Sequence, residues 1–205
     1  RAVLANGMAF KGGTIETFVG GKDYSATRTE LGTPTGYYLR RYVQESTSFT
    51  PEASTTNKHQ WIVYRYAEAI LRYAEAVNEY LGNPTSTDAT FTMSALDALN
   101  LIRANADMPD VEATTYAAFK DAVRREWRVE FAFEDHRFWD VRRWKIGQSV
   151  MGQIDGVEIV RDASGFSYSR KVVETRTWAE KMNLYPIPQA ETFNNPHLTQ
   201  NAGWQ

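Results

Sequence analysis

The most restrictive feature of this sequence is residues 119–144, where charged and aromatic side chains are densely mixed. This stretch contains six arginines, six acidic residues and seven aromatic residues. An amphipathic helix ordinarily keeps carboxylates off its apolar face. At about 100° per residue, however, three glutamates share one helical sector with apolar side chains. The glutamates are Glu126, Glu130 and Glu134, and the apolar residues are Phe119, Val123, Trp127 and Phe133.

Two interpretations of these three glutamates are open. Two carboxylates facing a cleft would serve as the acid and the nucleophile or base of a glycoside hydrolase. Alternatively, arginines neutralise them, because a core tolerates an ionised carboxylate only when it is paired and hydrogen-bonded. We favour pairing, with Glu126 and Glu130 buried, because arginines are abundant. The predicted structural ion-pair network is Arg72, Arg103, Glu126, Glu130, Glu134 and Arg137.

Composition excludes several other functions. A chain of 205 residues with 42% hydrophobic content has enough material for one domain. The net charge of −2 gives no basic footprint for nucleic acid. The absence of cysteine excludes disulfides and thiolate chemistry, and His59, His136 and His197 lack metal-ligand spacing. No metal, cofactor or catalytic residue is therefore predicted.

Periodicity predicts a mainly α-helical fold with irregular loops and minor β structure. Within a single domain, residues 1–57 are expected to be loop-rich, 58–147 to form a helical core, and 148–205 to form a hairpin and a proline-rich wrapping tail. Helices are predicted over residues 61–81, 93–106, 116–134 and 137–146. A β-hairpin is predicted over residues 154–173, with its turn at 162–165, followed by an extended tail over 183–205.

The first two predicted helices form a tetratricopeptide-like helical hairpin with alanines at the crossing. In the first helix, both an apolar face and an alanine face are expected to be covered. The apolar face is Ile62, Tyr66, Ile70, Tyr73, Val77 and Tyr80. Glu68 and Arg72 are spaced for an i,i+4 ion pair on its polar stripe. Because about three such repeats are usually needed to bury their faces, partners must be supplied upstream or by the rest of this chain.

Four sequence blocks resemble the SusD/RagB family. They are residues 65–79 (RYAEAILRYAEAVNE), 95–103 (ALDALNLIR), 125–144 (REWRVEFAFEDHRFWDVRRW) and 184–204 with its Pro186, Pro188 and Pro196. Asp135 stands where a glycine is commoner, and Ala202 where a proline is usual. Family members are about twice as long or more, so the chain resembles their carboxy-terminal part.

This resemblance implies a SusD-like fold and a non-enzymatic role in polysaccharide utilisation. Such proteins are lipoproteins of the outer membrane that capture oligosaccharides at the cell surface and cover a TonB-dependent, SusC-like transporter. The resemblance also implies a partner in the missing amino-terminal part and a lipid anchor outside this sequence. Motif residues Arg103, Glu126, Glu130, Arg137 and Asp140 belong to the scaffold in such proteins.

Glycans in this family are held mainly by variable loops, through aromatic rings that stack on sugar faces. Candidate glycan-binding residues are Tyr24, Tyr37, Tyr38, Trp61 and Trp178. For each of them, packing in a core or an interface is the alternative. A tetratricopeptide-like protein–protein interaction scaffold without sugar affinity is the second functional hypothesis, and a glycoside hydrolase is the third.

Overall fold

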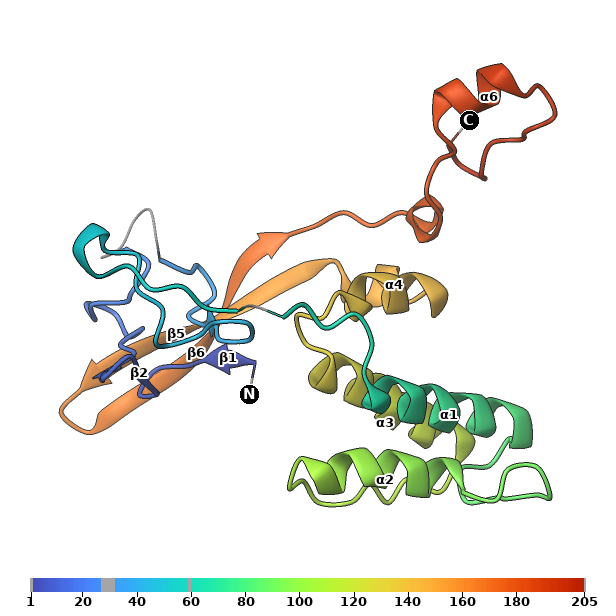
Figure 1. Ribbon diagram of the computed structural model, residues 1–205, viewed down its shortest axis with the longest axis horizontal. Coiled ribbons are helices and arrows are strands. Elements are labelled where there is room, and N and C mark those ends of the chain that lie inside the picture. The colour runs from blue at the N-terminus through green and yellow to red at the C-terminus, as the bar shows by residue number, and fades with distance from the viewer. Residues whose placement is uncertain (1, 27–31, 59, 205) are drawn as a thin grey trace. The chain divides into compact units, whose positions relative to one another are not determined.

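The structure is a computed structural model that describes residues 2–26, 32–58 and 60–204. The chain divides into two compact units, one formed by residues 1–59 and 138–205 and the other by residues 60–137. Figure 1 shows a long hairpin in the first unit and a group of helices in the second. His59 and residues 27–31 of the predicted loop-rich segment lie outside the described residues.

The second unit is built from α1 (Tyr66–Leu81), α2 (Ala95–Asn105) and α3 (Tyr116–Glu130). Both α2 and α3 pack against α1. Burial of one large apolar side chain contributes about 1.5–3 kcal/mol, so the interior of this unit is a principal source of its stability. That interior contains Leu71, Ala74 and Val77 from α1, Ala95, Ala98, Leu99 and Ile102 from α2, and Phe119, Val123 and Trp127 from α3.

The predicted helical hairpin is present, but its first helix starts later than predicted. Arg65 has extended backbone angles (φ −141°, ψ 157°), and α1 begins at Tyr66 instead of residue 61. The predicted apolar face is only partly covered, because Val77 is buried whereas Ile62, Tyr66 and Tyr80 are exposed. Glu68, placed on the polar stripe by its spacing, is buried.

Helix ends follow recognisable capping chemistry. Gly82 ends α1 in the left-handed conformation (φ 70°), which glycine adopts without steric cost. Ser94 caps α2 by accepting a hydrogen bond from the Asp97 amide at 3.1 Å. The third helix ends at Glu130, before its predicted end at residue 134, and Phe133 and Asp135 follow with φ of 65° and 64°. Aspartate tolerates this conformation better than most residues, which accounts for Asp135 at a position that favours glycine.

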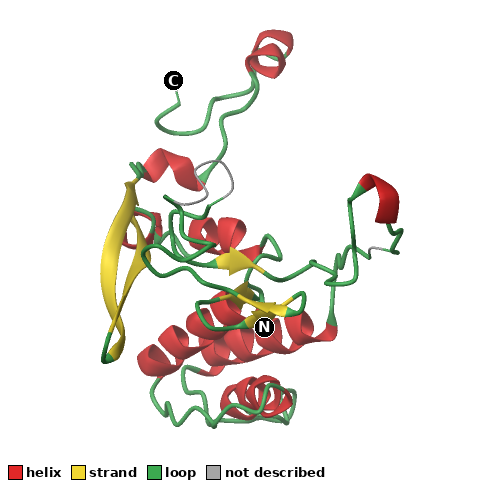
Figure 2. Cartoon of the chain, turned by 90° about the vertical axis from the view of Figure 1, so that its left-hand side faces the viewer, coloured by secondary structure: helices red, strands yellow, loops and turns green. Residues whose placement is uncertain are grey.

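The first unit contains the long antiparallel hairpin of β5 (Gln153–Asp162) and β6 (Gly165–Thr175), which stands out among the strands in Figure 2. The predicted turn is confirmed: Asp162 pairs with Gly165, and its side chain accepts a hydrogen bond from the Ser164 amide at 2.7 Å.

The amino-terminal loops pack onto this hairpin. The amide of Val19 donates to the Ile159 carbonyl at 2.8 Å, and that of Val157 donates to the Thr35 carbonyl at 2.9 Å. Gly36 approaches Val157 so closely that a Cβ atom would lie 2.7 Å from its carbonyl oxygen. The short elements of this layer are β1 (Val3–Leu4) paired with β4 (Tyr38–Leu39), β2 (Ala9–Phe10) paired with β3 (Gly13–Thr14), and η1 (Pro51–Ala53).

The remaining elements are α4 (His136–Arg143), α5 (Gly147–Val150), η2 (Glu180–Asn183) and α6 (Gln189–Asn194). The predicted fourth helix is too long, because Lys145 is left-handed (φ 54°) and the Ile146 amide bonds to the Val141 carbonyl at 3.1 Å. The tail is not simply extended, since η2 and α6 interrupt it. The predicted fold class, mainly helical with irregular loops and minor β structure, is confirmed.

Candidate functional site

The glutamates of the α3 region are engaged by arginines. Glu126 is only 6% exposed. One of its oxygens lies 2.7 Å from Nη1 of Arg103, an arginine in the last turn of α2. The Nε of Arg103 donates to the Pro109 carbonyl at 2.7 Å. The pair joins α2 to α3, and the same guanidinium group also binds the segment after α2 through its Nε.

Arg65 binds the other two glutamates. Its Nη1 lies 2.5 Å from Glu130 Oε1, and its Nε lies 2.9 Å from Glu134 Oε2. The same guanidinium lies over the Phe131 ring at 3.9 Å. Glu134 is nearly covered, whereas the Glu130 side chain is 23% exposed and thus less buried than expected.

A third cluster surrounds the buried Glu68. Arg72 donates to Glu68 Oε1 at 2.5 Å, in agreement with the i,i+4 spacing, and His136 Nε2 lies 3.4 Å from Oε2. The His136 ring also packs against Trp127 and Phe131, with centroid distances of 5.3 and 4.4 Å. Arg72 therefore pairs with Glu68, and none of these contacts joins it to the α3 glutamates.

This arrangement brings Arg103 and Glu126 together as a pair, whereas Glu130 and Glu134 share Arg65, an arginine outside the predicted set. The place of Arg137, in α4, within the network stays a prediction. The oxygens of these carboxylates are occupied by guanidinium groups, whereas both carboxylates of a glycosidase must be open to the substrate. The described geometry thus favours structural ties over an active site.

The predicted aromatic candidates are dispersed. Tyr37 is exposed beside β4, while the Tyr38 hydroxyl donates to the Asp23 carbonyl at 2.9 Å. Trp61, in the second unit, is 60% exposed. Trp178 lies against Gly147, where an added Cβ would overlap its indole ring, and 5.1 Å from the Arg142 guanidinium. Their roles in glycan binding stay predictions.

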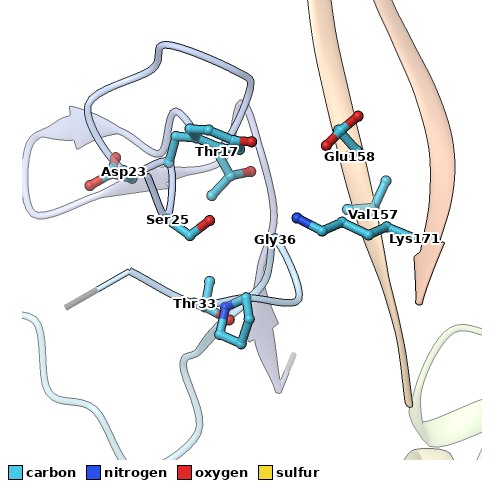
Figure 3. A pocket seen from close by; sticks show the side chains of 10 residues that line it. Thr17, Asp23, Ser25, Thr33, Gly36, Val157, Glu158 and Lys171 are labelled. Carbon is cyan, nitrogen blue, oxygen red and sulfur yellow. The ribbon is translucent and has the colours of Figure 1, made fainter. Parts of the chain in front are cut away.

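Tyr24 lines a small polar pocket between the loop layer and the hairpin (Figure 3). Lys171 extends from β6 toward the loop residues, and Thr17 is buried with no partner for Oγ1 among the described residues. The cavity volume is only about 10 Å³. This space holds about one water molecule, which would satisfy Thr17, and excludes a sugar ring.

A much larger groove, of about 920 Å³, lies between α4 and the tail. We call it the α4–tail groove. Ligand pockets commonly measure about 300–1,000 Å³, so its size suits a small oligosaccharide. It is lined by Trp139, Arg142, Arg143, Lys145, Glu180, Lys181, Asn183, Leu184, Tyr185, Ala202 and Gly203.

Aromatic rings give this groove flat apolar surfaces. Trp139 is 59% exposed and Tyr185 57% exposed, and their ring centroids lie 6.4 Å apart. Phe138 packs beside both, at 5.0 Å from Trp139 and 6.0 Å from Tyr185. Arg142 stacks over Phe138 at 3.6 Å, which presents its planar guanidinium alongside the rings.

Both walls of the groove are held by local contacts. On the α4 side, buried Asp140 binds the Arg143 Nε at 2.8 Å. On the tail side, Trp204 Nε1 donates to the carbonyls of Lys181 at 2.9 Å and Leu184 at 3.1 Å. The groove therefore has defined walls although both lie near the surface.

Trp139 and Tyr185 were not among the predicted binding residues. Both lie in the sequence blocks that resemble the family, where the motif favoured a scaffold role. The sequence signal was the adjacent pair Phe138 and Trp139 in the segment that forms α4, where the structure buries only Asp140 and Val141. Large aromatic side chains that a short helix does not bury face solvent, a ligand or a protein partner.

Two further classes of site are not seen in the described part of the chain. It contains no group of three or more His, Asp, Glu or Cys residues able to hold a metal ion. None of its helices combines the length and apolar character needed to cross a bilayer.

Comparisons with known proteins agree with one another. SusD-like protein P38 of Formosa agariphila is 30% identical over 173 residues, which is 80% of this chain and 28% of that protein. A SusD-like protein of Bacteroides fragilis matches with a TM-score of 0.78 and 28% identity, over 99% of this chain and 38% of that chain. A second protein of that species, described as a SusD-like carbohydrate binding protein, matches with a TM-score of 0.68 and 29% identity. This match covers 97% of this chain and 40% of that chain.

The chain thus spans 28–40% of the length of these relatives. The sequence profile of the SusD family matches residues 4–204, which include both compact units. The chain belongs to the SusD family.

Proposed function

We propose that this chain binds an oligosaccharide in the α4–tail groove, without catalysing a reaction. The observation that carries the proposal is the exposed pair Trp139 and Tyr185 in a groove of about 920 Å³. The C–H face of a sugar ring is apolar and packs on an aromatic ring, while its hydroxyls need polar neighbours. Arg142, Lys145 and Asn183 provide such neighbours in the same groove.

The wider role follows from family membership. We propose that the longer protein acts at the outer membrane, at the cell surface, through a lipid anchor outside this sequence. There it delivers oligosaccharides to a TonB-dependent, SusC-like transporter. A related B. fragilis protein is described as carbohydrate binding, which supports this proposal.

A second candidate function, protein–protein contact, has support in the other unit. Tyr66 and Tyr80 of α1 are exposed, and two large aromatic side chains on one helix suit a covering partner. We propose that the rest of the longer protein covers them, as the tetratricopeptide-like architecture requires. This contact complements sugar binding and does not use the α4–tail groove.

The test is a glycan array followed by calorimetry on the 205-residue chain, with two tryptophan variants. Trp139 and Trp61 are almost equally exposed, at 59% and 60%, but lie in different units. Trp139→Ala is expected to weaken binding at least about tenfold, whereas Trp61→Ala leaves it unchanged. Loss of binding only in Trp61→Ala, or no bound glycan, would refute the groove as the binding site.

A further inference from the structure

We propose that the α4–tail groove selects oligosaccharides that carry negative charge, as carboxylate or sulfate groups. This inference rests on the proposed sugar-binding function and specifies its ligand class. Four cationic side chains line the groove, and Glu180 is the acidic lining residue. The cationic residues are Arg142, Arg143, Lys145 and Lys181.

This local charge differs in sign from the charge of the whole molecule. The chain has a net charge of −2, so its composition alone would favour no anionic ligand. Clefts lined by one sign of charge concentrate ligands of the opposite sign. A positive groove on a slightly acidic chain therefore indicates a local binding site for anions and not non-specific binding of anions by the whole surface.

Only one of the four cations is neutralised by an ion pair within the described residues. Arg143 binds the buried carboxylate of Asp140 at 2.8 Å. Arg142 instead donates Nη1 to the Phe138 carbonyl at 2.8 Å. Lys181 lies over the Trp204 ring at 4.5 Å, which leaves its charge in place.

Lys145 is the best-placed single contributor to this selectivity. Lys145 lies after the end of α4 and has a left-handed backbone conformation. Its amide donates to the Arg142 carbonyl at 3.0 Å. The backbone is thus held while the exposed ammonium group has no ion-pair or hydrogen-bond partner among the described residues. Three donors on a flexible stem suit a carboxylate or sulfate oxygen.

The groove wall also contains unsatisfied polar atoms. Arg142 Nε and Asn183 Oδ1 are buried without partners within the described part of the chain. Buried polar atoms are nearly always hydrogen-bonded, so water is expected in this wall. Such water can bridge the wall to hydroxyl, carboxylate or sulfate oxygens of a bound sugar.

The experiment compares matched charged and uncharged oligosaccharides by calorimetry on the 205-residue chain. One pair is a short oligogalacturonate and its methyl ester, and the other is a κ-carrageenan oligosaccharide and its desulfated form. At least one charged form is expected to bind about tenfold tighter than its neutral counterpart. Added salt is expected to reduce this preference, because it screens exposed charges. A preference in both pairs assigns selection to charge in general, and a preference in one pair assigns it to that anion.

Variants locate the preference. Lys145→Gln combined with Lys181→Gln is expected to remove most of it while affinity for the neutral form changes less than twofold. Lys58→Gln, an exposed lysine of the same unit outside the groove, is the matched control. Equal binding of charged and neutral forms by the unmodified chain would overturn this inference and leave the proposed function standing. If the chain binds neither these sugars nor any other glycan, both the charge selectivity and the proposed function are overturned. If the double variant still prefers the charged form, the preference does not arise from the groove lysines.

Discussion

The two compact units use similar side chains in different ways. In residues 60–137, Arg65 and Arg103 are bound to glutamates and lie largely under protein. Lys145 and Lys181 line the same α4–tail groove as the exposed Trp139 and have no carboxylate partner among the described residues. Thus the presence of a buried partner, and not the type of residue, separates a structural tie from a binding group.

Desolvation explains the difference. A buried charge loses its hydration and becomes very costly unless a partner of opposite charge replaces the lost water. An exposed cation keeps its hydration and remains available to a ligand. Changes to the paired charges should therefore alter stability, whereas changes to the groove cations should alter binding.

The largest expected effect on stability is at the buried pair of the second unit. Glu126→Gln leaves the Arg103 guanidinium without its carboxylate and should lower the free energy of unfolding by about 3 kcal/mol. Chemical denaturation measures this change. Glu174→Gln, at an exposed hairpin pair with Arg176, is the control and should leave the melting temperature unchanged. Equal effects of the two substitutions would refute the contrast between buried and exposed charge.

The next effect tests the packing of Trp178 against Gly147. Gly147→Ala places a methyl group into the Trp178 indole and should lower stability by about 2 kcal/mol, because this space is filled. Gly152→Ala meets nothing within 4 Å and is the matched control. Thermal unfolding compares the two variants. An unchanged Gly147→Ala variant would show that Trp178 is free to move away from Gly147.

A smaller effect is expected for the coupling of Arg65 with Glu134. A double-mutant cycle of Arg65→Ala and Glu134→Gln should give an interaction free energy of about 1.5 kcal/mol, because the two groups lie 2.9 Å apart and are largely covered. Arg72→Ala should cost less than Arg65→Ala, because Arg72 is 65% exposed and Glu68 keeps His136 at 3.4 Å, whereas Arg65 holds two glutamates. The reverse order would contradict the ranking by burial.

The smallest effect concerns a surface pair and depends on pH. Hydrogen bonds from Lys120 and Tyr116 hold the pKa of Glu79 below its ordinary value of 4.5. The stabilisation is therefore present above pH 4.5 and is lost as the pH falls through the lowered pKa of the folded state. Glu79→Gln should cost about 0.5 kcal/mol at neutral pH and almost nothing in acid, as urea denaturation across this range would show. A cost that is independent of pH would exclude the ion pair as its origin.

Sequence reasoning succeeded where local chemistry decides the structure. The turn closed by Asp162 and Gly165 depends on residues close in sequence, and it was predicted. The pairing of Arg103 with Glu126 follows from two helices whose faces can be read from periodicity. In each case a repeating or nearest-neighbour geometry connects sequence to contact.

Sequence reasoning failed where that geometry stops. The helix predicted over residues 61–81 included Arg65, but Arg65 precedes α1 and has extended angles, so a helical projection does not apply to it. The same error affected Phe133, which follows the end of α3 and has φ of 65°. The α4–tail groove combines Trp139 with Tyr185 across a long hairpin, and no periodicity connects those positions.

The most direct test of the contrast between the units is amide hydrogen exchange on the full chain, with and without a bound acidic oligosaccharide. Protection is expected at residues 139–145 and 180–185, on the two walls of the groove, and not along α3. Protection centred on residues 126–134 would contradict the contrast, because it would place the ligand at the glutamates that are assigned here to structure.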